Sequence, residues 1–153
     1  MVKDRRASFV AYSSVLLWIG LVFFLSSPEG ASTETSRFLR PLIGFFFPNA
    51  SPELFEAAHF VVRKAAHFTE YAILAILAFR ACRLSGIAWL NGNYLIAPIV
   101  LVAAVAVLDE FNQSFEPSRT GSAWDSLLDC AGGIVAIFGC HFIASRRSKN
   151  RHL

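Results

Sequence analysis

The stretch YLIAPIVLVAAVAVLDEFNQSFEPSR, residues 94–119, places charge directly beside an uncharged apolar run. Residues 94–108 carry no charged side chain, whereas residues 109–119 carry four charged side chains and two amides. Fifteen residues cover only about 22 Å as a helix, and a hydrocarbon core is about 30 Å thick. The helix is therefore expected to continue through Gln113, which draws Asp109 and Glu110 toward the membrane. Ionisable groups at that depth are functional candidates by default.

The composition of the 153-residue chain is that of a membrane protein. Hydrophobic residues make up 55% and charged residues 16%, with a mean hydropathy of +0.50. Ordinary soluble domains contain about 25% charged residues. The length accommodates one domain, so residues 1–153 are expected to form a single unit whose main partner is membrane lipid.

Four apolar runs predict four spanning helices, at about residues 7–27, 64–82, 94–113 and 123–145. The first run follows basic residues, as a signal peptide does, but it is longer than a usual h-region and no clean small-x-small cleavage site follows it. A retained span is therefore favoured over a cleaved one. The expected fold is an all-α, polytopic membrane protein.

The distribution of Lys and Arg predicts the orientation. Basic residues cluster at residues 3–6, 80–83 and 146–151, which share one face of the membrane if the chain crosses it four times. By the positive-inside rule, this face is cytoplasmic and holds both termini. The loops at residues 28–64 and 109–122 are then extracytoplasmic. Because the basic residues flank apolar runs, the net charge of +3 does not indicate nucleic-acid binding.

The first outer loop is not simply hydrophilic. Residues 38–47 contain an aromatic and aliphatic cluster interrupted by Pro41, so an interfacial or re-entrant segment is expected there. Ser51-Pro52-Glu53 follows it and is a good helix start, with Ser as N-cap and Pro at the first helical position. That helix can continue unbroken through the second span to near Gly86.

The second span carries a polar pair, His67 and Glu70, on one helix face. His67 can act as a general acid or base tuned by Glu70, or as a metal ligand together with it. For a single His-x-x-Glu, the more common role is a hydrogen-bonded pair that holds helices together.

The third and fourth spans carry the remaining candidates. Either Asp109 or Glu110 can contact the Gln113 amide, and adjacent acids point in different directions, so one should face the bundle and the other water or Arg119. Arg119 is suited to bind a carboxylate or a phosphate. On the fourth helix, the helix dipole favours Asp125 near the start. Asp129 lies four residues deeper and needs a partner, which His67 or Gln113 can supply.

Metal binding is a minor alternative for these residues. One set with enough ligands is His67, Glu70, Asp109 and Asp129, but it contains a single His and no spacing that demands a metal. The three cysteines also lack such a spacing and are expected to be packing groups. No metal is therefore assigned, and no cofactor is indicated.

Three motifs resemble the VanZ-like membrane proteins over about residues 10–145. They are Lys64-x-x-His67-Phe68-x-Glu70-Tyr71, Asp109-Glu110-x-x-Gln113-x-Phe115-x-Pro117-x-Arg119 and Asp125-x-x-x-Asp129-x-x-Gly132. The resemblance implies a bacterial cytoplasmic-membrane protein and, for the founding member, a link to low-level resistance to the glycopeptide teicoplanin. Asp129 departs from the family pattern, which usually has Asn there, and so adds negative charge.

Two classes of function fit these observations. In the first, the chain is an enzyme or a binder of a lipid-linked cell-envelope precursor, with a polar pocket at the extracytoplasmic face. In the second, it is a small transporter or accessory protein whose polar residues form a structural plug between helices. Whether it is an enzyme is left open. The candidate pocket residues are His67, Glu70, Asp109, Glu110, Gln113, Arg119, Asp125 and Asp129.

Overall fold

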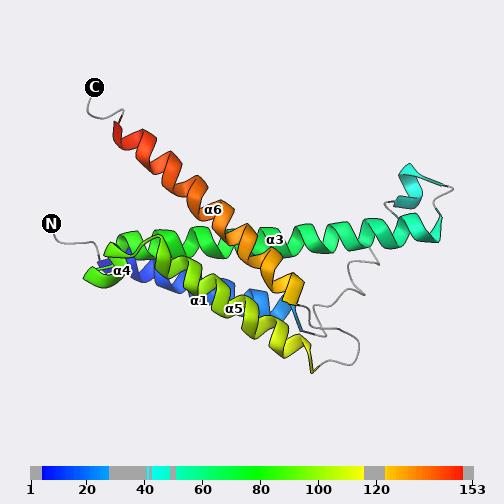
Figure 1. Cartoon of the computed structure of the whole chain (residues 1–153), viewed down its shortest axis with the longest axis horizontal. Coiled ribbons are helices and arrows are strands. Elements are labelled where there is room, and N and C mark those ends of the chain that lie inside the picture. Colours follow the sequence, from blue (N-terminus) through cyan, green and yellow to red (C-terminus); the bar gives the residue numbers. More distant parts are fainter. Residues whose placement is uncertain (1–4, 28–40, 42, 49–50, 116–122, 150–153) are drawn as a thin grey trace.

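The protein is a bundle of long helices. The computed structural model describes residues 5–27, 41, 43–48, 51–115 and 123–149. The elements of this part are α1 (Arg5–Leu25), α3 (Pro52–Leu84), the short α4 (Ala88–Gly92), α5 (Ile96–Gln113) and α6 (Ala123–Lys149) (Figure 1). Four of them are long and apolar enough to cross a membrane. The described residues contain no strand, and the predicted all-α, polytopic fold is confirmed.

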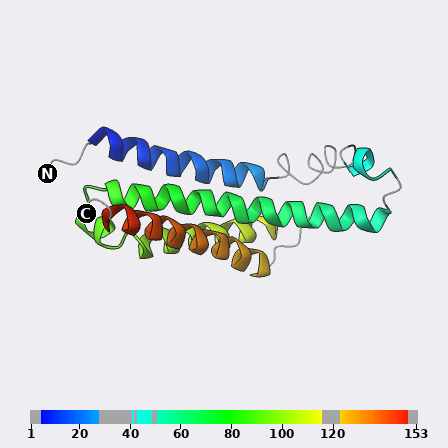
Figure 2. The same ribbon diagram turned by 90° about the horizontal axis from the view of Figure 1, so that it is seen from above.

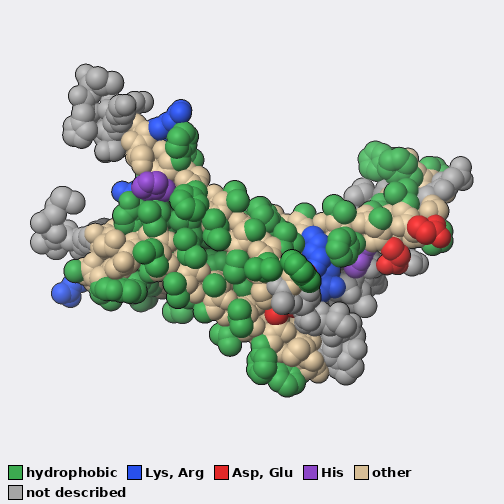
Figure 3. Space-filling model, in the orientation of Figure 1, with side chains coloured by type: hydrophobic (Ala, Val, Ile, Leu, Met, Phe, Trp, Pro, Cys, Tyr) green, Lys and Arg blue, Asp and Glu red, His purple; other side chains and the backbone are tan. Residues whose placement is uncertain are grey.

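The surface of the bundle is apolar, as expected of a surface that faces lipid. Many large hydrophobic side chains are exposed, among them Leu17 at 75% and Trp124 at 79%. Figure 3 shows apolar side chains over most of the visible face of the bundle. Such a surface would be unfavourable in water and is stable in hydrocarbon.

Both termini lie toward the same end of the molecule as α4, with the end of α6 diverging from the other helices (Figures 1 and 2). Helices α1 and α5 run away from this end, and α3 and α6 run toward it. We call it the basic end, because its described charged side chains are all arginines: Arg5, Arg6, Arg80, Arg83, Arg146 and Arg147. The opposite end of the bundle is called the polar end.

Helix α3 is the longest element and the centre of the bundle. Its 33 residues extend about 50 Å, well beyond the roughly 30 Å of a hydrocarbon core. Its N-terminal part therefore projects past the other helices (Figure 2). The helix begins at Pro52, and the Ser51 side chain accepts the Leu54 N–H at 3.3 Å, as the sequence predicts.

The described part of the segment between α1 and α3 lies near the tip of α3 (Figure 1). Residues 43–46 form a helical turn, and Phe45, Phe46 and Phe47 are 60–79% exposed. Residues 38–40 and 42 of the expected interfacial or re-entrant segment lie outside the described residues.

Two adjacent glycines allow α6 to pack closely on its neighbours. A Cβ at Gly132 would lie 2.4 Å from the Phe68 carbonyl oxygen of α3, and one at Gly133 would lie 2.8 Å from Val102 Cγ1 of α5. Small residues at such positions let membrane helices approach until their backbones touch. The close approach brings the polar side chains of α3 and α6 together.

Hydrogen bonds attach α1 to α3 along its length. Near the polar end, Trp18 Nε1 donates to the Glu70 carbonyl oxygen at 2.9 Å. Near the basic end, the Tyr12 hydroxyl donates to Ser85 Oγ at 2.6 Å, and Ser8 Oγ donates to the Leu84 carbonyl oxygen at 2.7 Å. The Ser8 bond occupies a carbonyl in the last turn of α3, which has no partner within the helix.

Candidate functional site

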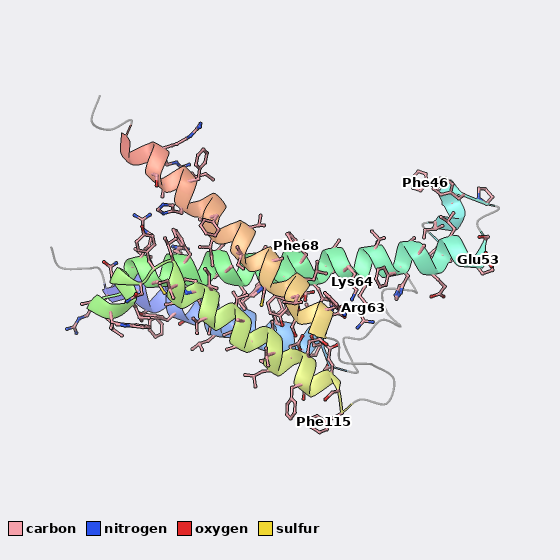
Figure 4. All side chains as sticks on the ribbon, in the orientation of Figure 1. Phe46, Glu53, Arg63, Lys64, Phe68 and Phe115 are labelled. Carbon is pink, nitrogen blue, oxygen red and sulfur yellow. The ribbon has the colours of Figure 1, made fainter. Side chains whose placement is uncertain are left out.

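Seven of the eight candidate residues lie in the described part of the chain, and the structure brings them together at the polar end. They come from the start of the bundled part of α3, the last turns of α5 and the first turns of α6. Figure 4 labels Arg63, Lys64 and Phe68 along this part of α3. The eighth candidate, Arg119, lies outside the described residues.

Asp109 is the centre of the first polar group. It is fully buried, and its Oδ2 accepts hydrogen bonds from Ser26 Oγ at 2.9 Å, Gln113 Nε2 at 3.0 Å and the Tyr71 hydroxyl at 3.3 Å. These donors come from the segment after α1, from α5 itself and from α3. One carboxylate oxygen thus connects α5 with α3 and with the segment that follows α1, which is mainly a structural role.

Only part of this group is predictable from the sequence. Gln113 was expected to contact Asp109 or Glu110, and the structure shows the contact with Asp109. Ser26 was missed. The available signal was a hydroxyl residue at the end of an apolar span, but serine is common there, and nothing in the spacing connects it to a residue 83 positions later.

His67 and Asp129 form the second group, between α3 and α6. His67 Nδ1 lies 3.6 Å from Asp129 Oδ1; the His67 side chain is 14% exposed and that of Asp129 is fully buried. Neither Asp129 oxygen has a hydrogen-bond partner among the described residues, nor does His67 Nδ1. A buried carboxylate that accepts no hydrogen bond is unfavourable. Both oxygens of Asp129 are in this position, whereas Asp109 Oδ2 accepts three hydrogen bonds.

Lys64 and Asp125 form an ion pair about one helical turn closer to the polar end of the bundle than the His67–Asp129 pair. Their side chains are 25% and 18% exposed, so the pair lies at the rim. Lys64 Nζ also lies 5.2 Å from the centre of the Phe60 ring. Asp125 thus has a specific partner besides its position at the start of a helix.

The two remaining acids are Glu70 and Glu110. That Glu70 tunes His67 stays a prediction, and the direct contact of His67 is with Asp129, for which His67 was one of two expected partners. Glu110 is only 7% exposed, so the alternative in which it faces water is wrong. Successive helical residues are about 100° apart, and both acids are buried because α5 is covered on more than one side here. The other expected partner of Glu110, Arg119, lies outside the described residues.

Metal ligands are not assembled in the described ranges. No three of the His, Cys, Asp and Glu side chains there are arranged to hold a metal ion. Of the four residues considered as a metal set, Asp109 belongs to the first group, His67 and Asp129 form the second, and Glu70 belongs to neither. Cys82, Cys130 and Cys140 are free thiols.

Comparison with known proteins gives one finding about this chain. The family model described as VanZ/LLP1 matches residues 9–144, a range that includes all eight candidate residues. No curated protein and no solved structure matches the chain.

Proposed function

Because the chain belongs to the VanZ/LLP1 family and has four helices able to cross a membrane, we propose that it binds a lipid-linked cell-envelope precursor. The binding site is the polar end, at the outer leaflet of the bacterial cytoplasmic membrane. The positive-inside rule supports this orientation, because it assigns the basic end and both termini to the cytoplasm. The observation that carries the proposal is the buried, unsatisfied Asp129 carboxylate beside His67.

The chemistry of the pair suits the polar head of such a precursor. Asp129 can accept hydrogen bonds from sugar hydroxyls or peptide N–H groups, and His67 can donate or accept a proton. Lys64 at the rim can bind a phosphate in place of Asp125, since the exchange keeps one ion pair. Lipid-linked precursors carry a polar head and a phosphate next to a hydrocarbon chain. The head can therefore bind Asp129 and His67 while the phosphate binds Lys64.

The surroundings of the pair suit the hydrocarbon part. Phe111 of α5 and Phe115, just after this helix, are 61% and 71% exposed, and their ring centres are 4.9 Å apart in an edge-to-face contact. Trp124 and Leu127 of α6 are also exposed. These side chains can contact a lipid tail while the head reaches the polar residues.

A second candidate function has its own supporting observation. The three donors to Asp109 Oδ2 form a buried connection between helices, as expected for an accessory protein or small transporter whose polar residues are structural, although Asp109 Oδ1 has no hydrogen-bond partner among the described residues. The two candidate functions predict that different substitutions will abolish function. Ligand binding depends on His67, and helix assembly depends on Asp109.

A binding measurement in lipid nanodiscs tests the proposal. The probe is a polyprenyl-diphosphate-linked disaccharide-peptide, with a phospholipid of similar chain length as a reference. We expect His67→Gln to weaken probe binding at least tenfold with unchanged thermal stability. His141→Gln is the matched control, because His141 lies near the basic end with its Nδ1 3.5 Å from the Tyr94 hydroxyl. Absence of binding by the wild type, or equal loss in both variants, overturns the proposal.

Glycopeptide tolerance is a separate, cellular consequence of the proposal. A protein that binds the precursor at the outer leaflet competes with teicoplanin for it or changes its availability. Expression in a susceptible bacterium is therefore expected to raise the inhibitory concentration of teicoplanin, and His67→Gln at equal membrane abundance is expected to remove the increase. An increase that persists in His67→Gln would contradict the assignment of this pair.

A further inference from the structure

A hollow of about 580 Å³ lies near the basic end, remote from the polar residues. It is lined by residues of α1, α3, α4 and α5, and its width results from small side chains, including Ala78 and Ala81 of α3 and Ala97 and Ala104 of α5. Sites for small ligands typically occupy about 300–1,000 Å³. The hollow is thus large enough for part of a lipid.

The walls of the hollow select hydrocarbon. Among the lining residues, only Tyr12, Cys82 and Trp89 carry a polar side-chain atom. The Tyr12 hydroxyl is already engaged, since it donates to Ser85 Oγ at 2.6 Å. Water in a cavity needs two to four polar partners, and these walls offer too few.

The hollow results from the arrangement of α1 and α5. The two helices lie along neighbouring flanks of α3 (Figures 1 and 2). They are joined at the polar end by the Ser26–Asp109 hydrogen bond. Toward the basic end, the hollow lies between them above the alanines of α3, and Ile96 and Val100 at its edge are 62% and 60% exposed. In a membrane, this edge faces lipid tails.

The charges at the basic end indicate the kind of head group. All described acidic residues lie at the polar end or on the projecting part of α3, so no described acidic side chain lies here to repel an anion. Asp4, which precedes Arg5 in the sequence, lies outside the described residues. Arg5 precedes Tyr12 by seven residues, which is two helical turns and the same face of α1. Its guanidinium therefore lies beyond the hollow in the direction of the head groups. Trp89, 65% exposed at the rim, is a residue type enriched at the membrane–water boundary.

We propose that this hollow binds one acyl chain of an anionic phospholipid whose phosphate is held near Arg5. The bound lipid fills the space between α1 and α5 and replaces contacts that the alanines cannot make. Basic pockets between membrane helices are a recognised chemistry for anionic head groups. The site belongs to the leaflet at the basic end and is independent of precursor binding at the polar end.

Native mass spectrometry of the full chain tests the proposal. The protein is released from micelles that contain equal amounts of phosphatidylglycerol and phosphatidylcholine, and we expect one retained phosphatidylglycerol per chain. Ala104→Phe fills the hollow from its exposed rim and is expected to reduce retention at least fivefold. Ala131→Phe is the matched control, because it adds the same bulk to an exposed position of α6.

The head-group part has a test of its own. Arg5→Gln is expected to reduce the preference for phosphatidylglycerol at least threefold, whereas Arg146→Gln, at the same end on α6 and stacked on Phe142, is expected to leave it unchanged. Equal retention of both lipids by the wild type overturns the anionic assignment. The site itself is overturned if the wild type retains no lipid, if Ala104→Phe and Ala131→Phe lose lipid equally, or if the chain forms a dimer that excludes lipid.

Discussion

Gly132→Ala is expected to force α3 and α6 apart at the point where they cross. The new Cβ would lie 2.4 Å from the Phe68 carbonyl oxygen and 3.2 Å from its carbonyl carbon. Ordinary contact begins near 3.4 Å, so the helices must separate by about 1 Å, because a backbone oxygen in a helix has no rotamer to change. Overpacking of this kind costs about 1–3 kcal/mol.

The matched variant Gly139→Ala isolates that cost. Alanine is favoured over glycine within a helix by about 1 kcal/mol, a gain that partly conceals the clash at residue 132. Gly139 lies on the same helix with nothing within 4 Å of its added Cβ, so its substitution gives the gain without the clash. The difference between the two variants in free energy of unfolding should therefore equal the overpacking cost of about 1–3 kcal/mol.

The assay is unfolding in mixed micelles of increasing SDS content, followed by tryptophan fluorescence. A second readout is precursor binding, because His67 and Asp129 flank the crossing and their 3.6 Å separation should increase with it. If Gly132→Ala is as stable as Gly139→Ala, α6 does not approach Phe68 this closely. The register that places Asp129 on His67 would then be refuted.

Three further predictions use the same unfolding measurement. Asp109→Ala should lose several kcal/mol, since each of its buried donors left without an acceptor costs about 1–3 kcal/mol, whereas Asp109→Asn keeps an acceptor and should lose less; equal losses would contradict this. Trp18→Phe should cost about 1 kcal/mol through the lost bond to the Glu70 carbonyl, and an unchanged stability would argue against that bond. A double-mutant cycle of Lys64→Gln and Asp125→Asn should give a coupling below about 1 kcal/mol, as for other partly exposed pairs, and a coupling of about 3 kcal/mol would mean that the pair is buried.

The helical architecture could be predicted because it depends on local properties of the chain. Uncharged runs long enough to cross hydrocarbon indicate spanning helices, since each backbone polar group must be satisfied within the segment. The long α3 also follows from local signals. Ser51 and Pro52 start it, and neither glycine nor proline interrupts it before Gly86.

The candidate site could be predicted only as a set of residues at one end. Spacing within a helix shows that His67 and Glu70 share a face, but it does not show which side chain of another helix meets them. For Asp129 the sequence left His67 and Gln113 as alternatives; the structure pairs it with His67 and buries Glu110.

The sequence by itself determined that four apolar helices cross a membrane and which residues interrupt them with charge, because burial of backbone and charge in hydrocarbon is decided segment by segment. Only the tertiary structure decided the partners. Contacts between helices depend on their rotation and separation, which the glycines of α6 set here by letting backbones touch. That packing joins Ser26 to Asp109 at one end and leaves an apolar hollow between α1 and α5 toward the other.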